Sequence, residues 1–273
     1  MMAKHYQIAH DTAVKQKMKT YEDPDTGNLV FTEFGLKQKG RCCGCGCRHC
    51  PFQHQKIPMA ARISRIQNPA WLTNPQPEST HVLFWSGGKD SFLALRAMTN
   101  TLPKASITLL ATFDATTRVV AHQEVALKEI VDQALELNLP LIGVPLNSGD
   151  DYISKVEAGL ALMDEIDVLA FGNLHLEHIK NWNEQAFAPF LSRSGASIHF
   201  PLWCTDYKVL LHDLVKSGAE CTISAATHPL ISHLVGQRFD NVFIEGLPDE
   251  IDQFGEYGEF YTRISSNHLR KHK

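Results

Sequence analysis

Residues 81–98 read HVLFWSGGKDSFLALRAM, and this stretch decides the fold. A short apolar run, 81–85, leads into the glycine-containing segment Ser86–Ser91, after which apolar residues recur at helical spacing. Glycines at such a junction let the backbone approach a ligand, and the N-terminus of the following helix offers unpaired N–H groups. The stretch therefore predicts a phosphate-binding loop at the carboxyl end of a buried strand.

Downstream of this stretch, apolar runs alternate with helical patterns. Runs typical of buried strands lie at 107–113, 139–146 and 167–171. Apolar residues recur at helical spacing in 119–137, 151–164 and 176–191, and shorter elements continue to 221–225 and 241–246. This alternation predicts an α/β fold, in which helices cover both faces of a parallel, twisted, Rossmann-like sheet.

The N-terminal part differs from the rest in charge and in cysteine content. Residues 1–65 carry 11 Lys+Arg against 5 Asp+Glu, whereas residues 66–273 carry 15 against 25. Five of the seven cysteines lie between Cys42 and Cys50, and a polar stretch with three prolines precedes His81. These changes predict three parts, namely a cysteine-rich, metal-binding module over 1–57, a linker over 58–79 and a main domain over 80–273.

The composition excludes several classes of protein. With 44% hydrophobic and 21% charged residues, the chain is typical of a soluble globular protein. No apolar run approaches the roughly 18 residues of a membrane helix, and the N-terminus has no apolar secretory segment. Clustered cysteines in odd number are a poor disulfide framework and favour a metal or thiol site in a reducing compartment. We therefore expect a cytoplasmic protein without membrane contact.

The segment Ser86–Ser91 has side chains suited to binding phosphate. Its two serines offer hydroxyl donors, and Lys89, which we expect to face solvent or ligand, adds a positive charge. Asp90 fits such a site if Mg²⁺ bridges the protein and the phosphate. The Walker spacing of glycine and lysine is absent, so a different class of nucleotide-binding loop is indicated.

SGGKDS resembles the PP-loop of the ATP pyrophosphatase family. The resemblance implies cleavage of ATP between the α and β phosphates, with the leaving pyrophosphate held in the loop. It also implies that adenine contacts the backbone at the turn after the second strand. The residues expected to bind the nucleotide are Ser86, Gly87, Gly88, Lys89, Asp90, Ser91, Phe113 and Asp114.

Three further stretches resemble one branch of that family, the diphthine–ammonia ligase type. They are FGNLHLEHI (171–179), PLW (201–203) and GEYGEFYT (255–262), so the resemblance covers about residues 80–262. It implies an adenylating ligase that activates a carboxyl or amide acceptor for attack by ammonia or another nucleophile. Two departures leave the acceptor undefined: Tyr261 stands where the motif usually has His, and Asn173 stands where an acidic residue is common.

Candidate functional residues follow from these motifs. Glu256 and Glu259, each preceded by glycine, could bind ammonium, orient the nucleophile or act as general base, or else be turn residues. The expected catalytic residues are Lys89, Asp90, Glu256 and Glu259. The expected substrate-binding residues are His122, Gln123, Gly172, Asn173, His175 and Glu177; orienting a loop or starting a helix is the alternative role for them.

The cysteine cluster is a candidate metal centre. Dense thiolates repel one another unless a cation neutralises them, so we expect the cluster to bind Zn²⁺ or an iron–sulfur cluster. Reduced thiols without metal are the alternative. Residues 21–52 resemble a small uncharacterised cysteine-rich domain that usually shows four of these cysteines, and the resemblance implies Cys42, Cys43, Cys47 and Cys50 as ligands, with Cys45 as the extra thiol. The surrounding Lys and Arg residues could contact RNA or form a solvated surface.

Three functions therefore remain open. The first is an adenylating amide ligase acting on a small molecule or a protein side chain, which the GEYGEF segment favours. The second is a tRNA-modifying sulfur-transfer enzyme, which the cysteines and the basic N-terminal module favour. The third is an ATP-binding regulatory module without catalytic activity.

Overall fold

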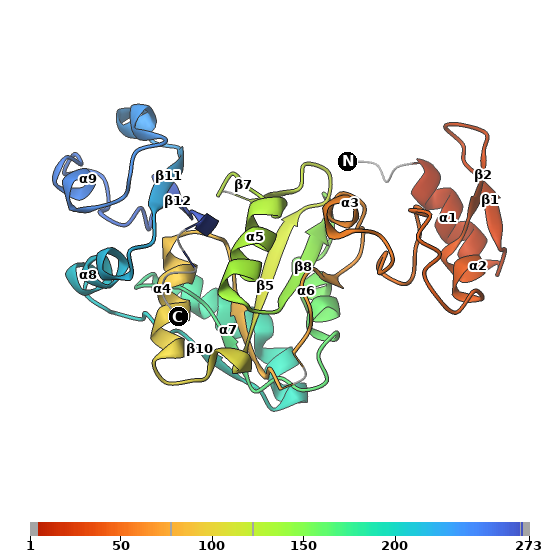
Figure 1. The fold of residues 1–273 in the computed structure, drawn as a ribbon, viewed down its shortest axis with the longest axis horizontal. Helices are drawn as coiled ribbons and strands as arrows, with labels where there is room; N and C mark the ends of the chain where they lie inside the picture. Colours follow the sequence, from red (N-terminus) through yellow and green to blue (C-terminus); the bar gives the residue numbers. More distant parts are fainter. Residues whose placement is uncertain (1–4, 77, 122, 268, 270–273) are drawn as a thin grey trace.

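A six-stranded sheet forms the centre of the protein (Figure 1). The computed structural model describes residues 5–76, 78–121, 123–267 and 269. The strands, in spatial order, are β10 (Ser197–His199), β9 (Val168–Ala170), β4 (His81–Phe84), β5 (Ile107–Asp114), β8 (Leu141–Leu146) and β3 (Ala70–Trp71). All neighbours are parallel except β3, which pairs antiparallel with β8. The expected α/β fold with a mostly parallel sheet is confirmed.

Helices cover both faces of the sheet because its central strands are apolar on both sides. In β4, Leu83 packs into a core shared with Phe92, whereas the adjacent Val82 packs into a second core with Val156 and Phe187. The first core lies under α4 (Lys89–Thr99) and α5 (Leu127–Leu137). The second lies under α6 (Tyr152–Leu160) and α7 (Glu177–Ser194).

The C-terminal part adds a smaller layer beside α4 (Figure 1). Its elements are α8 (Tyr207–Ser217), β11 (Cys221–Ala226), the 3-10 helix η2 (Pro229–Leu234), α9 (Asn241–Glu245) and β12 (Phe260–Ile264). Strands β11 and β12 pair antiparallel, outside the main sheet. The backbone N–H of Ile264 donates to the Gly87 carbonyl at 2.9 Å, which brings this layer onto the predicted phosphate loop.

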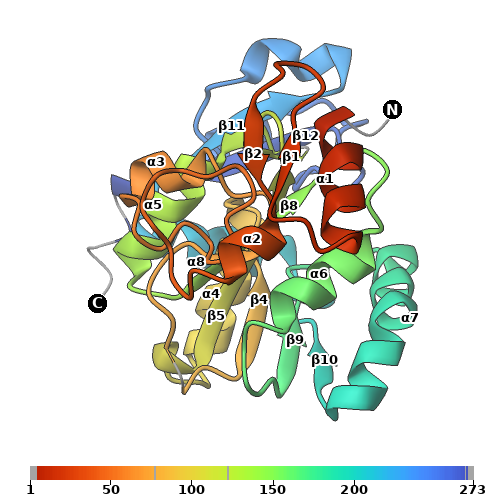
Figure 2. The same ribbon diagram turned by 90° about the vertical axis from the view of Figure 1, so that its right-hand side faces the viewer.

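The N-terminal module lies at one end of the molecule and is drawn in red in Figures 1 and 2. It consists of α1 (His5–Lys15), β1 (Thr20–Glu22), β2 (Leu29–Phe31) and α2 (Glu33–Lys37). Its small core is partly polar: Arg48 donates to the buried Asp23 carboxylate at 2.7 Å and to the Tyr21 hydroxyl at 3.2 Å. These bonds connect the cysteine loop to the first strand.

The segment 58–79 differs from the free linker that its composition indicates. It contains α3 (Met59–Ile63) and the sheet strand β3, and Ile66 and Leu72 are fully buried in the main core. The Thr73 hydroxyl accepts from the Leu141 N–H at 2.7 Å. The segment predicted as a linker therefore packs against the main domain through a few deeply buried apolar side chains, which its polar, proline-containing composition conceals.

The helix expected over 119–137 begins only at Leu127. Before it lie the two-residue strands β6 (Val119–Val120) and β7 (Val125–Ala126), which pair antiparallel. A further short element is the 3-10 helix η1 (Lys104–Ser106). Among the residues that the structure describes, no helix has the length and apolar character needed to cross a membrane.

We predict that Leu72→Ala lowers the free energy of unfolding by about 2–5 kcal/mol, because the truncation leaves a cavity in the main core beside Gly143 of β8. Urea denaturation followed by circular dichroism measures the change. Asn74→Ala, at an exposed position of the same segment, is the control and should leave the midpoint unchanged. Equal midpoints for the two variants would contradict the burial of Leu72 in the main core.

Candidate active site

The segment predicted to bind phosphate, Ser86–Ser91 (the phosphate loop), connects the end of β4 to the start of α4. Gly87 has φ +82°, and a Cβ at Gly88 would lie 2.8 Å from Gln123 Oε1 and from the Thr262 carbonyl, so neither position accepts a side chain without displacement. Gly88 is the N-cap of α4 and provides no side-chain cap. No side chain of the loop caps the helix; Thr262 Oγ1 of β12 accepts from the Lys89 N–H, and the N–H groups that follow lie beside the loop, as a phosphate site requires.

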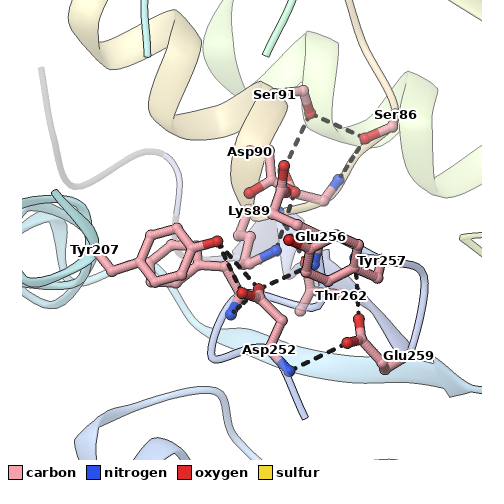
Figure 3. Close-up of polar contacts among 12 residues, drawn as sticks. Ser86, Lys89, Asp90, Ser91, Tyr207, Asp252, Glu256, Tyr257, Glu259 and Thr262 are labelled. Carbon is pink, nitrogen blue, oxygen red and sulfur yellow. Dashed lines mark hydrogen bonds and ion pairs between the residues drawn. The ribbon is translucent and has the colours of Figure 1, made fainter. Parts of the chain in front are cut away.

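The two serines of the loop support it from within. Ser91 Oγ donates to the Gly88 carbonyl at 3.0 Å and lies 3.3 Å from Ser86 Oγ (Figure 3). Ser86 Oγ in turn accepts from the Gly88 N–H at 3.3 Å. The hydroxyls thus hold the loop in shape and lie where they could reach a bound phosphate.

Lys89 is buried, whereas the sequence predicts that it faces solvent or ligand. Only 2% of the residue is exposed, and its Nζ lies 3.0 Å from Asp90 Oδ2. Three rings surround the ammonium, with centroids 5.2–5.7 Å from Nζ: those of Phe239, Phe254 and Phe260. Aromatic residues of the C-terminal layer thus cover the cation. Local sequence patterns could not predict this contact, because the residues are far apart in the chain.

The loop 252–259 brings the C-terminal motif to Lys89 (Figure 3). Asp252 Oδ1 accepts from the N–H groups of Phe254 and Glu256, at 2.9 and 3.1 Å. The Glu259 carboxylate accepts from the N–H groups of Asp252 and Tyr257, both at 3.1 Å. The two expected carboxylates thus differ in position, because Glu259 braces the loop backbone whereas Glu256 lies beside Lys89 and Asp90.

The proton affinity of Glu256 is unusual. Burial, together with the negative charge of Asp90, raises the pKa of its carboxyl to about 8, and the nearby Lys89 only partly offsets the increase. Glu256 is therefore mostly protonated at neutral pH in the ligand-free protein. Such a group can deliver or accept a proton near pH 7.

Sequence patterns missed Tyr207 and Asp252. The Tyr207 hydroxyl donates to the Asp252 carboxylate, 3.1 Å from each oxygen, and lies 3.3 Å from His175 Nδ1. Burial, with the Asp252 charge, raises the pKa of Tyr207 far above its ordinary value, so the hydroxyl stays protonated. Tyr207 begins α8 and lies outside every sequence motif, so no pattern indicated it. For Asp252, the available signal was its position shortly before a glycine turn.

Some of the expected substrate-binding residues lie at the loop. Gln123 Oε1 is buried near Gly88 without a hydrogen-bond partner among the described residues. A Cβ at Gly172 would meet the Asp90 carbonyl carbon and oxygen, so Gly172 lies against the loop. His122 lies outside the described residues. Asn173 accepts from Asn183 of α7 at 3.2 Å, which orients the Asn173 loop relative to that helix.

Other expected residues are engaged elsewhere. Glu177 is an exposed residue in the first turn of α7. Phe113 is buried in the core, and Asp114 Oδ1 accepts from the N–H groups of Thr116 and Thr117, at 2.8 and 2.6 Å. In the turn after β5, the two side chains and the N–H groups of Thr116 and Thr117 are therefore engaged in internal contacts.

A pocket of about 450 Å³ adjoins the site. Tyr207, Asp252, Tyr257 and Glu259 form the wall on the side of the C-terminal motif. The remaining wall comes from the end of α9 and the following loop: Ile244, Leu247, Pro248, Asp249, Glu250, Ile251 and Gln253. The pocket is large enough for a small organic molecule or a side chain, and acidic groups dominate its charge.

The cysteines of the N-terminal module form two close pairs. The sulfur atoms of Cys43 and Cys47 are 3.5 Å apart, and those of Cys42 and Cys50 are 3.9 Å apart. Hydrogen bonds from the Cys45 backbone and the Cys47 thiol lower the pKa of Cys43 to about 7, whereas burial and the bond to Cys43 raise that of Cys47 to about 11. Within the described residues, no group of three or more His, Cys, Asp or Glu is already arranged to hold a metal ion.

Comparisons with known proteins cover the two parts of the chain unequally. A family model described as a family of unknown function, DUF5522, matches residues 9–56, which include all five clustered cysteines. Among solved structures, the chain is similar to the crystal structure of a predicted subunit of tRNA methyltransferase from Methanocaldococcus jannaschii. The identity is 18% and the TM-score 0.37, over 68% of this chain and 95% of that chain, a likeness too distant to assign a function.

We predict that stability decreases as pH rises because of Glu256. Its folded-state pKa of about 8 exceeds the ordinary 4.5, so between these values the native state retains a proton that the unfolded state releases. The stabilisation is fully present below pH 4.5 and is lost as pH rises through 8, by at most about 1.4 kcal/mol per pH unit. Urea titrations from pH 5 to 9 measure this slope.

The matched variant is Glu256→Gln, which keeps the size of the side chain and removes the titration. Its unfolding free energy should fall less between pH 5 and 8 than that of the wild type. Identical slopes for the two proteins would contradict the placement of Glu256 beside Asp90.

Proposed function

We propose that this protein is an ATP-dependent adenylating enzyme that converts ATP to AMP and pyrophosphate while activating an acceptor. The observation that carries the proposal is the meeting of two distant motifs. The N-terminus of α4, with Lys89 and Asp90, lies against the C-terminal segment that contributes Glu256 and Thr262. Thr262 Oγ1 accepts from the Lys89 N–H at 3.0 Å.

The loop would hold the pyrophosphate that leaves. The N–H groups at the start of α4, the two serine hydroxyls and the Lys89 ammonium can meet the negative charge that develops on the β phosphate. Asp90 Oδ1 is buried and has no hydrogen-bond partner among the described residues, which fits a carboxylate that holds Mg²⁺ against the phosphates. When bound, Mg²⁺ would neutralise phosphate charge.

The acceptor would enter from the pocket lined by Tyr207 and Asp252. An acceptor carboxylate oxygen attacks the α phosphorus, and the bond from that phosphorus to the bridging oxygen of the β phosphate breaks. An acyl adenylate and pyrophosphate result. An amine nucleophile, ammonia in the simplest case, then attacks the acyl carbon, and AMP leaves with the bonding electrons. Once Glu256 has given up its own proton, its carboxylate could accept the proton that the amine releases.

The first test is Lys89→Met, which we predict lowers the rate of pyrophosphate release at least about 100-fold. Methionine keeps much of the apolar contact with the three rings and removes the charge. A coupled assay with Mg²⁺-ATP, ammonium and candidate carboxylic acids measures the release. Unchanged turnover in a folded variant would refute the proposal.

Lys128→Met is the matched control. Lys128 is exposed on α5 and pairs with Asp132 at 2.6 Å, away from the loop. Its replacement should leave pyrophosphate release unaltered, and thermal unfolding of both variants separates loss of chemistry from loss of folding.

We further propose that the N-terminal module binds Zn²⁺ or an iron–sulfur cluster through Cys42, Cys43, Cys47 and Cys50. Two thiol pairs on one short loop provide four soft ligands, the donor set that these centres prefer. Cys45 is the thiol left over. The role would be structural, because the small, partly polar core of the module would gain stability from a bound metal.

The metal proposal predicts a clear elemental result. Protein prepared without oxygen should contain Zn or Fe, and joint replacement of Cys43, Cys47 and Cys50 by Ser should remove it. Cys45→Ser is the control and should retain the metal. Metal-free wild-type protein with an intact N-terminal module would contradict the proposal.

A sulfur-transfer enzyme acting on tRNA is the second candidate. The observation that favours it is the pairing of thiols in a basic module, which could carry sulfur and contact RNA. An iron–sulfur absorbance in the visible range, with pyrophosphate release that depends on tRNA and not on ammonium, would favour this candidate over the ligase.

A further inference from the structure

We propose that Gln133 is the positioning residue of the phosphate loop, and that its amide makes the loop and the C-terminal strand β12 a single unit. Gln133 lies on α5 and is fully buried. Its Oε1 accepts from Trp85 Nε1 at 2.8 Å, and its Nε2 donates to the carbonyls of Gly87 at 3.2 Å and Ile264 at 2.7 Å. The inference rests on the proposed function, because it assumes that the loop binds phosphate.

The bond to Gly87 determines which way the loop offers its N–H groups. The Gly87 carbonyl accepts from Gln133 and also from the Ile264 N–H, so two donors hold it on the side of α5 and β12. In a planar trans peptide the N–H points opposite to the C=O. The N–H of Gly88 therefore points away from Gln133, towards Ser86 Oγ and the space before α4.

The chemistry requires an amide at this position. One planar group must accept from an indole N–H and donate to two carbonyls. A carboxylate could accept but not donate, and its charge would repel both carbonyl oxygens. An aliphatic side chain would leave the Trp85 indole N–H and the carbonyls of Gly87 and Ile264 buried without their hydrogen bonds to Gln133. Burying polar groups without such bonds is energetically unfavourable.

The same amide links nucleotide binding to the acceptor side of the site. Ile264 ends β12, whose Thr262 holds the Lys89 N–H, and β12 follows the loop that carries Glu256. Displacement of the Gly87 carbonyl would therefore be transmitted to β12, and to Trp85, whose indole shares the amide. All four tryptophans lie in the described part of the chain, and of these Trp85 is the buried one.

The experiment measures binding of Mg²⁺-pyrophosphate to the full chain by calorimetry and by tryptophan emission. We expect pyrophosphate to change the emission of the wild type. Trp85→Phe should abolish this change, and calorimetry on the same variant measures how much affinity remains once Gln133 has lost its indole donor. Gln133→Leu should weaken pyrophosphate binding about tenfold or more, because the loop N–H groups lose their orientation.

Gln133→Glu provides a second variant with a distinctive pH profile. At pH 8 it should bind pyrophosphate as poorly as Gln133→Leu. Relative to the wild type at each pH, its binding should recover as the pH falls towards 5, because a protonated carboxyl regains one donor. A purely structural defect would not produce this recovery.

Leu137→Ala, in the last turn of α5 and away from the loop, is the stability-matched control and should bind pyrophosphate like the wild type. Wild-type affinity in both Gln133 variants, or an equal loss in Leu137→Ala, would overturn the role of Gln133 while leaving the proposed function intact. If the wild type binds neither ATP nor pyrophosphate, the proposed function fails, and the inference with it.

Discussion

Two hydrogen bonds join β12 to the phosphate loop, from the Ile264 N–H to the Gly87 carbonyl and from the Lys89 N–H to Thr262 Oγ1. The second connects residues 173 positions apart, so the site exists only once the whole domain has folded. The position of Glu256 and the aromatic cover of Lys89 both depend on this contact. Closing such a long loop is entropically unfavourable, and burial of β12 and the adjoining rings compensates for it.

The charges of the assembled site favour ligands that bring cations with them. Asp90, Asp252 and Glu256 gather near the Lys89 ammonium (Figure 3). Retention of a proton on Glu256 reduces the excess of negative charge while no ligand is bound. Such a site is poised for cations to enter together with the polyanion, since phosphates alone would be repelled by the carboxylates.

Local patterns predicted the parallel sheet, most of its helices and the junction of β4 with α4, because those depend on short-range periodicity and on glycine. They could not distinguish Glu256 from Glu259, which have the same local sequence context; backbone direction in the loop 252–259 separates their roles. They also could not show that Lys89 is buried, since its three aromatic neighbours follow it by about 150 residues or more. Tyr207 and Gln133 lie in no sequence motif, so their roles could not be predicted.

The short strand β3 also covers part of an edge of the sheet through which molecules could pair with one another. Without it, β8 would be an edge strand of a parallel sheet, with a row of unpaired N–H and C=O groups able to pair with the same edge of another molecule. Ala70 and Trp71 occupy part of that edge, and the prolines at 69 and 75 flank them without N–H groups to donate. The segment that connects the cysteine module to the domain thus limits edge-to-edge aggregation.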